Sequence, residues 1–207
     1  MSGVIAQNVG RNSGLIKAAS AAGEWTLIKT LTSDGSDATL SFVNGTSDVV
    51  LDSTYDEYCF KFINIHPQTD ATEFLFNGSV DTGSNYNVSK TTTYFHAYVL
   101  EADGSSNTIA YHRASDFSST VFQRIVNDRV GNGNDENTSG WLYLLAPSNT
   151  TFQKHFMSHA TWNASNDYVQ NSFMGGYFNN TSAVDAIQFK MSSDEIQGGS
   201  ISLYGIG

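Results

Sequence analysis

Charge, cysteine and proline are all scarce in this chain of 207 residues. Only 14% of the residues are charged, and the chain has one cysteine and two prolines. The single Cys59 excludes an intrachain disulfide, and the apolar strand pattern around it predicts a buried, unreactive thiol. Aromatic residues nevertheless make up 13% of the chain, which supplies material for a core. We therefore expect a folded domain rather than a disordered chain.

Positive charge is especially rare. The chain has 20 acidic and 10 basic residues, a formal net charge of -10. Such a field repels phosphates, so we expect no nucleic-acid partner. No apolar run approaches the roughly 18 residues of a membrane span, and the first residues lack the continuous apolar stretch of a signal peptide. These absences predict a protein that is made in the cytoplasm and has no membrane partner.

Acidic residues are missing altogether from residues 1–23, which also lack aromatic residues and contain two basic ones. Residues 24–207 carry the remaining charge of -12. We expect a short extended N-terminal arm, 1–23, followed by one β-domain, 24–207. The arm would dock on a partner subunit, although a frayed terminus has the same composition. Its candidate docking residues are Val4, Ile5, Arg11, Leu15, Ile16 and Lys17.

Recognisable catalytic motifs are absent as well. The chain has no Gly-x-Ser-x-Gly elbow and no phosphate-binding glycine loop of the Walker or dinucleotide type. Glycoside hydrolysis needs two carboxylates at a fixed separation, and the sequence nominates no such pair. We expect a protein that is not an enzyme and uses no cofactor, with a polysaccharide-cleaving enzyme as the alternative in which the fold pairs two acids.

What the sequence does contain from residue 24 onward is a hydrophobic period of two, interrupted by Gly, Asn, Asp and Ser. This pattern predicts an all-β fold: a two-sheet β-sandwich, jelly-roll-like, with about ten strands. Candidate strands are 24–31, 38–43, 57–65, 72–76, 92–100, 108–113, 140–146, 152–162, 172–178, 186–191 and 200–206.

Three parts of the chain carry more specific expectations. The Asp34-Gly35 step predicts a hairpin turn between the first two strands. Residues 57–65 are nearly all bulky, which favours a central strand buried on both faces. The segment 115–129 has apolar residues at roughly helical spacing, so a short helix and a crossing loop both remain open.

Oxygen-bearing side chains gather around glycines in residues 127–137, as a calcium loop requires. The candidate ligands are Asp128, Asn132, Asn134 and Asp135. The spacing fits no EF-hand, and a solvated turn is the competing interpretation. His155 and His159 would lie on one face of a strand, and without a further ligand we expect a structural role for both.

Aromatic residues in loop-like contexts suggest carbohydrate binding, because sugars stack on aromatic rings and bond to Asn and Asp side chains. The candidates are Tyr86, Trp162 and Tyr168, the last two flanking residues 163–167. The alternative is that these rings cover the edge of the sandwich.

Three segments carry a resemblance to known proteins. They are the closing residues 199–206 (GSISLYGI), residues 47–58 (SDVVLDSTYDEY) and residues 60–67 (FKFINIHP). They resemble a widespread group of marine bacteriophage virion structural proteins, whose last strand has a similar G-x-I-x-L-Y-G pattern. In the closing strand, glycines would permit tight bends at the ends of a half-buried strand. The resemblance implies a β-rich protein of the virion surface and assigns no catalytic residue.

Two functions fit the resemblance. The first is a capsid decoration or cement protein, a homo-oligomer expected to be a trimer, whose arm binds the major capsid protein or other virion subunits and stabilises the shell. The second is a tail-fibre or host-recognition module that binds a cell-surface glycan of the host. Fold alone does not separate the two.

Overall fold

The computed structural model describes residues 23–116 and 118–207, and within them the chain is built almost entirely of β-strands. Thirteen strands are present, and every pairing between them is antiparallel. The only helical element in these residues is a single 3-10 turn, Arg113–Ser115. The all-β class predicted from the period of two is confirmed, with more strands than the ten expected.

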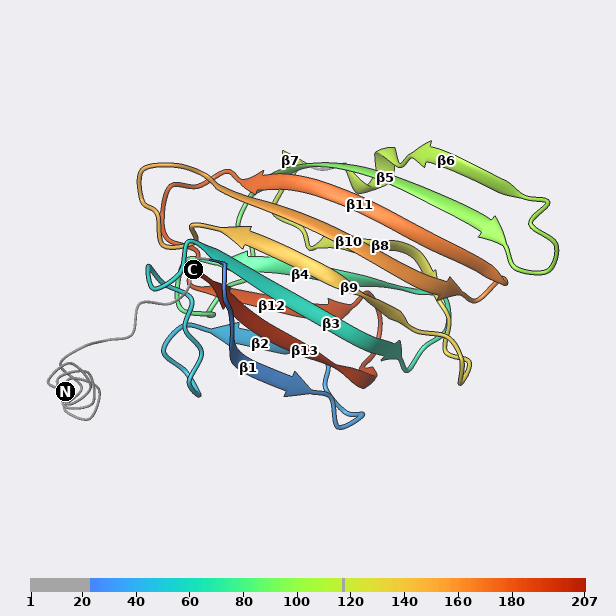
Figure 1. Cartoon of the computed structure of the whole chain (residues 1–207), viewed down its shortest axis with the longest axis horizontal. Helices are drawn as coiled ribbons and strands as arrows, with labels where there is room; N and C mark the ends of the chain where they lie inside the picture. Colours follow the sequence, from blue (N-terminus) through green and yellow to red (C-terminus); the bar gives the residue numbers. More distant parts are fainter. Residues whose placement is uncertain (1–22, 117) are drawn as a thin grey trace, which may run out of the picture.

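The strands form two layers (Figure 1). The order of the large sheet is β1 (Trp25–Thr32), β13 (Ile196–Ile206), β3 (Glu57–Pro67), β9 (Thr138–Leu145), β10 (Lys154–Ala164), β11 (Tyr168–Phe178), β5 (Lys90–Leu100) and β6 (Asn107–Tyr111). The order of the small sheet is β8 (Gln123–Val130), β4 (Thr72–Ser79), β12 (Ala186–Met191) and β2 (Leu40–Val43). The short β7 (Ser118–Ser119) pairs with the start of β5.

The two layers are joined at one corner. Ala164 of β10 pairs with Val130 of β8, so the ladder of strands runs without a break from β1 to β2. The result is a flattened, nearly closed barrel, whose interior lies between the small sheet and the inner face of the large one. In the described part of the chain, no helix is long and apolar enough to cross a membrane.

Phenylalanine rings from both sheets fill the interior. Phe74 of β4 stacks on Phe189 of β12 at 5.8 Å, and Phe76 of β4 meets Phe156 of β10 edge to face at 5.2 Å. All four rings are buried. Since each buried aromatic side chain removes about 150–250 Å² from water, this cluster is the main apolar contact between the layers.

Two expectations about the first half of the chain are wrong. Asp34-Gly35 does not close a hairpin, because β1 pairs with β13 in the large sheet and β2 pairs with β12 in the small sheet. The turn instead carries the chain from one layer to the other. Strand β3 is central but not buried on both faces. Lys61 and Ile63 are exposed because the side of the large sheet that faces away from the small sheet is open to solvent at β3.

The segment that sequence left open, 115–129, is neither a helix nor a simple loop. It contains β7 and most of β8, the edge strand of the small sheet. Ile125 and Val126 are both buried, since β8 twists across the corner where the two layers meet. The apolar residues at helical spacing do not share one buried face, since Val121 is exposed before β8 whereas Ile125 is buried within it.

The closing strand β13 adopts the conformation that its glycines allow. Gly199 has a φ of +101°, at a point where the pairing with β3 shifts register. A methyl group on Gly205 would come within 2.2 Å of the Tyr55 ring, which packs directly on the strand. Ile201 and Leu203 point into the core, as the half-buried pattern predicts.

Candidate functional site

The inner face of the large sheet is closed along part of its length and open beyond it. Tyr94 of β5 is fully buried, and its hydroxyl lies 3.2 Å from the Ile125 carbonyl and 2.9 Å from the Asn127 side-chain oxygen of β8. Next along the inward row of β5 come His96 and Tyr98, and both are only half-buried. The small sheet therefore covers Tyr94 and leaves the end of β5 accessible.

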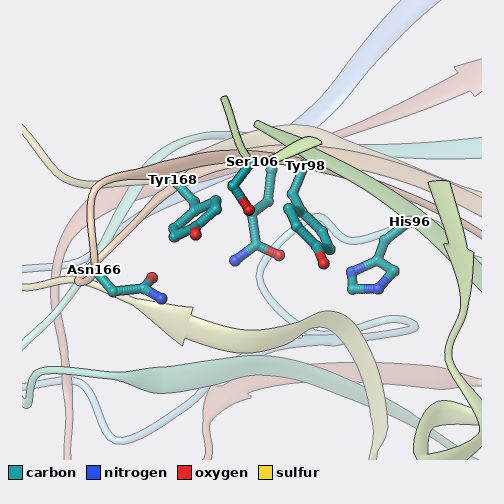
Figure 2. A pocket seen from close by; sticks show the side chains of 6 residues that line it. His96, Tyr98, Ser106, Asn166 and Tyr168 are labelled. Carbon is teal, nitrogen blue, oxygen red and sulfur yellow. The ribbon is translucent and has the colours of Figure 1, made fainter. Parts of the chain in front are cut away.

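A pocket of about 280 Å³ opens at this end of the sheet (Figure 2). It is lined by residues from two neighbouring strands and the loops at their ends. Those residues are His96 and Tyr98 of β5, Tyr168 and Gln170 of β11, Ser106 of the β5–β6 loop and Asn166 of the β10–β11 turn. The volume lies just below the ~300–1,000 Å³ of sites for drug-sized ligands, so the pocket suits a small molecule.

Strand pairing explains why these side chains converge. Tyr98 lies opposite Gln170 in the β5–β11 register, and Tyr168 lies one inward position further along. Side chains on one face of paired strands are about 4.5–5.5 Å apart, so the pairing alone brings the groups together. The backbone amide of Leu100 bonds to the Ser106 carbonyl at 2.9 Å and so holds the β5–β6 loop beside them.

The β10–β11 turn places Asn166 at the pocket rim. Asp167 adopts a φ of +62°, and its amide bonds to the Ala164 carbonyl at 3.0 Å. Asp and Asn tolerate this left-handed conformation better than most residues, so the sequence suits a tight turn. The Glu101 amide bonds to the Asp167 carbonyl at 2.9 Å, which ties the turn to the end of β5.

Aromatic rings form a row along the pocket. The ring centroids of His96 and Tyr98 are 5.6 Å apart, and those of Tyr98 and Tyr168 are also 5.6 Å apart, both pairs edge to face. His112 continues the row at 5.4 Å from His96. Figure 2 shows Asn166, Tyr168, Tyr98 and His96 following one another, with Ser106 between the tyrosines in this view.

The polar groups of the pocket are largely unused by the protein. Among the residues that the structure describes, no hydrogen bond is made by the Tyr98 and Tyr168 hydroxyls or by the Asn166 and Gln170 amides. Gln170 is only 6% exposed as a residue, but its amide atoms are not among the fully buried atoms without a partner in the described chain, so they remain accessible in the pocket. Tyr94, one inward position before His96, shows the contrast, because its hydroxyl is bonded on the core side.

A second surface is notable: the outer face of the large sheet over β5, β6, β9, β10 and β11. These five strands contain only two charged residues, Lys90 and Lys154, and both point inward and are fully buried. The apolar side chains that remain exposed there are Phe95, Ile109, Tyr111, Met157, Val169 and Phe173, at 41 to 79% exposure. We call this surface the outer face.

Rings continue across the outer face from strand to strand. Phe173 stacks on Phe95 at 5.1 Å and on His159 at 4.5 Å, and Trp141 follows His159 at 5.6 Å. Beside this band the face is hollowed by about 510 Å³ over Gly175 and Gly176, with a mostly apolar lining. The face therefore offers both projecting rings and a recess.

The three residues expected to contact glycans lie in three different environments. Tyr168 lines the pocket, so the ring is available there. Trp162 does not fit the expectation: it points into the core at 1% exposure, because inward and outward positions alternate along β10. Tyr86 is half-buried away from the pocket, and its carbonyl accepts a hydrogen bond from the Asn77 amide at 2.7 Å.

Sequence reasoning missed four of the six lining residues: His96, Tyr98, Ser106 and Gln170. Alternation along β5 marks His96 and Tyr98 as sharing a face with Tyr94. Nothing in the sequence, however, says that β5 pairs with β11, seventy residues away. That pairing is what turns two separate polar strand ends into one pocket.

Three of the candidate calcium ligands, Asn132, Asn134 and Asp135, follow the end of β8, and Asp128 lies within that strand. The Asn132 amide donates to the Gln68 carbonyl at 3.1 Å, and Asn134 lines a polar hollow with Glu136. The Glu136 carboxylate accepts from the Gly133 amide at 2.6 Å. In residues 23–116 and 118–207, no group of three or more His, Cys, Asp or Glu side chains is placed to hold a metal. Calcium binding by Asp128, Asn132, Asn134 and Asp135 stays an untested hypothesis beside the competing solvated turn.

Cys59 is buried beside Tyr143 and Tyr204, its neighbours on the adjoining strands. Burial raises the pKa of the Cys59 thiol to about 12, and a thiol that stays protonated at neutral pH is a poor nucleophile. The expectation of a buried, unreactive cysteine is confirmed.

Comparisons with protein-family models, curated proteins and solved structures find no match to this chain. The resemblance to bacteriophage structural proteins therefore remains a proposal. The expected docking residues of the arm, Val4, Ile5, Arg11, Leu15, Ile16 and Lys17, lie outside the described residues, so that expectation also stays a prediction.

Proposed function

We propose that the chain is a non-enzymatic structural protein of a bacteriophage virion, a capsid decoration or cement protein that associates with copies of itself and stabilises the shell. The observation that carries the proposal is the outer face, five strands wide and without an exposed Asp, Glu, Lys or Arg on those strands. An assembly subunit needs such a surface, whereas a protein that works alone does not.

Electrostatics favours a second copy of the chain as the occupant of the outer face. Each copy carries a net charge of -10, so two copies repel one another over most of their surfaces. Contact through the outer face places no like charges opposite each other. It also covers rings that water solvates poorly.

The outer face is large enough for a stable interface between two copies. Aromatic side chains bury about 150–250 Å² each, so six large side chains near half exposure offer on the order of 500 Å² of apolar surface. A stable interface buries roughly 800 Å² per partner, which the neutral residues between these side chains supply. The recess over Gly175 and Gly176 gives the projecting rings of another copy a place to insert.

Projecting rings of one copy would insert into the recess of the next copy, so the two surfaces in contact differ. Such an arrangement fits a closed ring of copies. Contacts of that kind are heterologous, and they produce rings when the rotation closes. The trimer is the state we propose, and a jelly-roll-like sandwich is the fold class that we propose with it. The closing GSISLYGI strand, which resembles that of phage structural proteins, supports the same assignment.

Attachment to the shell is the test. Purified full-length protein is mixed with isolated capsids that lack it, and the capsids are sedimented. We expect the protein to pellet with the capsids and to raise the temperature at which they disrupt, because binding to the assembled state stabilises it. Deletion of residues 1–20 should abolish pelleting. Protein that stays in the supernatant at every concentration would refute the assignment.

The second candidate function is a tail-fibre or host-recognition module that binds a cell-surface glycan. The pocket between β5 and β11 favours it, since aromatic rings and unpaired amides are the groups that sugars contact. Incubation of the purified protein with host cells tests this function: retention on the cells supports it, and absence of retention removes it.

A further inference from the structure

We infer that the pocket between β5 and β11 is a binding site for one uncharged sugar residue. The inference deepens the second candidate function. It rests on that function only in naming the host cell surface as the source of the sugar. Binding itself is independent of where the protein sits on the virion.

The first argument is the chemistry of the lining. The six lining residues include no Asp, Glu, Lys or Arg, in a chain with 30 such residues. A phosphate or carboxylate would meet no Lys or Arg side chain there, only the His96 imidazole, and an ammonium group would meet no carboxylate. An uncharged ligand rich in hydroxyls avoids both costs.

The second argument is the supply of hydrogen-bonding groups. Tyr98 and Tyr168 hydroxyls can each donate and accept, and the amides of Asn166 and Gln170 add four donor hydrogens and two acceptor oxygens. Within the described chain these groups have no other hydrogen-bond partner. Gln170 is the most informative, because the residue is more than nine-tenths buried while its unpaired amide stays accessible in the pocket, where a ligand can bond to it.

The third argument is the combination of those groups with rings. Sugars present hydroxyls at their edges and apolar C–H groups on their faces. The row formed by His96, Tyr98 and Tyr168 provides ring surface beside the amides, with centroids 5.6 Å apart along it. The volume of about 280 Å³ limits the occupant to a small unit, with the rest of a longer glycan outside.

Alternatives fit less well. A flat aromatic ligand would need two parallel rings as a slot, and the Tyr98 and Tyr168 rings are inclined by 79°. An apolar ligand would leave the Gln170 amide desolvated and unpaired. The neutral sugar satisfies the rings and the amides together.

The test uses the full-length protein and saturation-transfer NMR with methyl glycosides of glucose, galactose, mannose and N-acetylglucosamine. Glucuronic acid and N-acetylneuraminic acid serve as charged probes. We expect at least one neutral glycoside to bind in the millimolar range and both charged sugars to bind at least tenfold more weakly.

Four variants locate the binding. Tyr98→Ala and Gln170→Leu should each weaken binding about tenfold, and Ser106→Ala, a small change in a loop, about twofold to fivefold. Tyr111→Ala removes a tyrosine of the outer face and should leave binding unchanged. Melting temperatures confirm that each variant is folded, and Tyr98→Phe replaces Tyr98→Ala if the latter is not.

Three results would overturn the inference: no neutral glycoside binds, binding survives in the pocket variants, or the charged sugars bind as well as the neutral ones. The capsid sedimentation assay, repeated with Gln170→Leu, tests whether loss of the sugar site also affects binding to the shell. Pelleting should be unaffected, so the sugar site and the shell attachment fail independently.

Discussion

Lys90 is a cation held inside the protein by neutral groups. Its ammonium group donates to the Asn77 side-chain oxygen at 2.9 Å and to the carbonyls of Val121 at 2.5 Å and Val88 at 3.4 Å. Burial lowers the pKa of Lys90 from 10.5 to about 7, because desolvation disfavours the charged form. Between pH 7 and 10.5 the unfolded chain therefore binds more protons at this site than the folded one.

This difference predicts that the protein becomes more stable as the pH rises from 7 to 9. The free energy of unfolding should increase by about 1 kcal/mol per pH unit, since the cost of the buried charge is complete below pH 7 and is relieved above it. Urea unfolding at several pH values measures the slope. The window stops at pH 9 because Cys59, whose pKa is raised, acts in the opposite sense at higher pH.

Two lysine variants separate Lys90 from the other groups. Lys90→Met should reduce the slope and leave the contribution of Lys154, whose pKa burial also lowers, whereas Lys61→Met, which removes an exposed lysine of β3, should preserve the slope. Equal slopes in the wild type and Lys90→Met would show that Lys90 is not the group responsible.

Gly199 is the residue on which the closing strand depends most. With a φ of +101°, an alanine there would be strained, and its methyl group would lie 2.4 Å from the Asn64 carbonyl oxygen. We expect Gly199→Ala to lower the free energy of unfolding by about 1–3 kcal/mol. Gly198→Ala is the matched control, because its methyl group would have only an ordinary contact, 4.0 Å from His66. Equal losses in the two variants would contradict the role of the left-handed conformation.

At the scale of elements, the β8–β9 loop is closed by its own hydrogen bonds. The Gly133 amide bonds to the Glu136 carboxylate, and the Asn132 side chain bonds across to Gln68. A loop held in this way does not require an ion to fold. We therefore expect calcium chelation to leave the melting temperature unchanged, as measured by calorimetry with and without a chelator. A drop of several degrees would instead establish the calcium site.

Most strands were predictable from sequence because they are long enough to show a period of two or a run of bulky residues, whereas the two-residue β7 and the strand β8 were not predicted. Residues 57–65, 92–100 and 186–191 fall within or on β3, β5 and β12. Pairing was not predictable, because it depends on contacts between distant segments. The Asp34-Gly35 turn looked like a hairpin for this reason. For 115–129 a short helix and a crossing loop both stayed open, because apolar residues before and within β8 fall at roughly helical spacing.

Because strand pairing was not predictable, the candidate site could be predicted only in part. Tyr168 was identifiable from its position beside an Asn- and Asp-rich turn, and it does line the pocket. Trp162 had the same local signal and points to the same inner face of the large sheet, opposite Gln170, but the core covers it at 1% exposure. Whether an inward aromatic residue near a turn faces ligand or core depends on whether the small sheet covers that part of the large sheet, which only the three-dimensional structure fixes.

At the scale of the whole molecule, the outer face should control association. Lysine at two of its positions, in the double variant Phe173→Lys and Ile109→Lys, brings like charges together in any contact between outer faces. We expect the wild type to have the mass of an oligomer, a trimer in our proposal, and the double variant to be a monomer. Light scattering after size-exclusion chromatography measures both masses.

A matched control uses an exposed apolar residue outside the outer face. Leu27→Lys, on β1 at 55% exposure, adds a positive charge outside the five strands and should leave the oligomer intact. A wild type that is monomeric at high micromolar concentration, or a double variant that keeps the oligomer, would exclude the outer face as the contact between copies.

The most direct measurement of the central claim is an electron cryomicroscopy map of the virion that contains this protein. Our account predicts density for the two-layered sandwich on the icosahedral shell, in groups of copies whose outer faces meet. Density for the sandwich on the tail alone, or single copies on the shell with outer faces open to solvent, would contradict it.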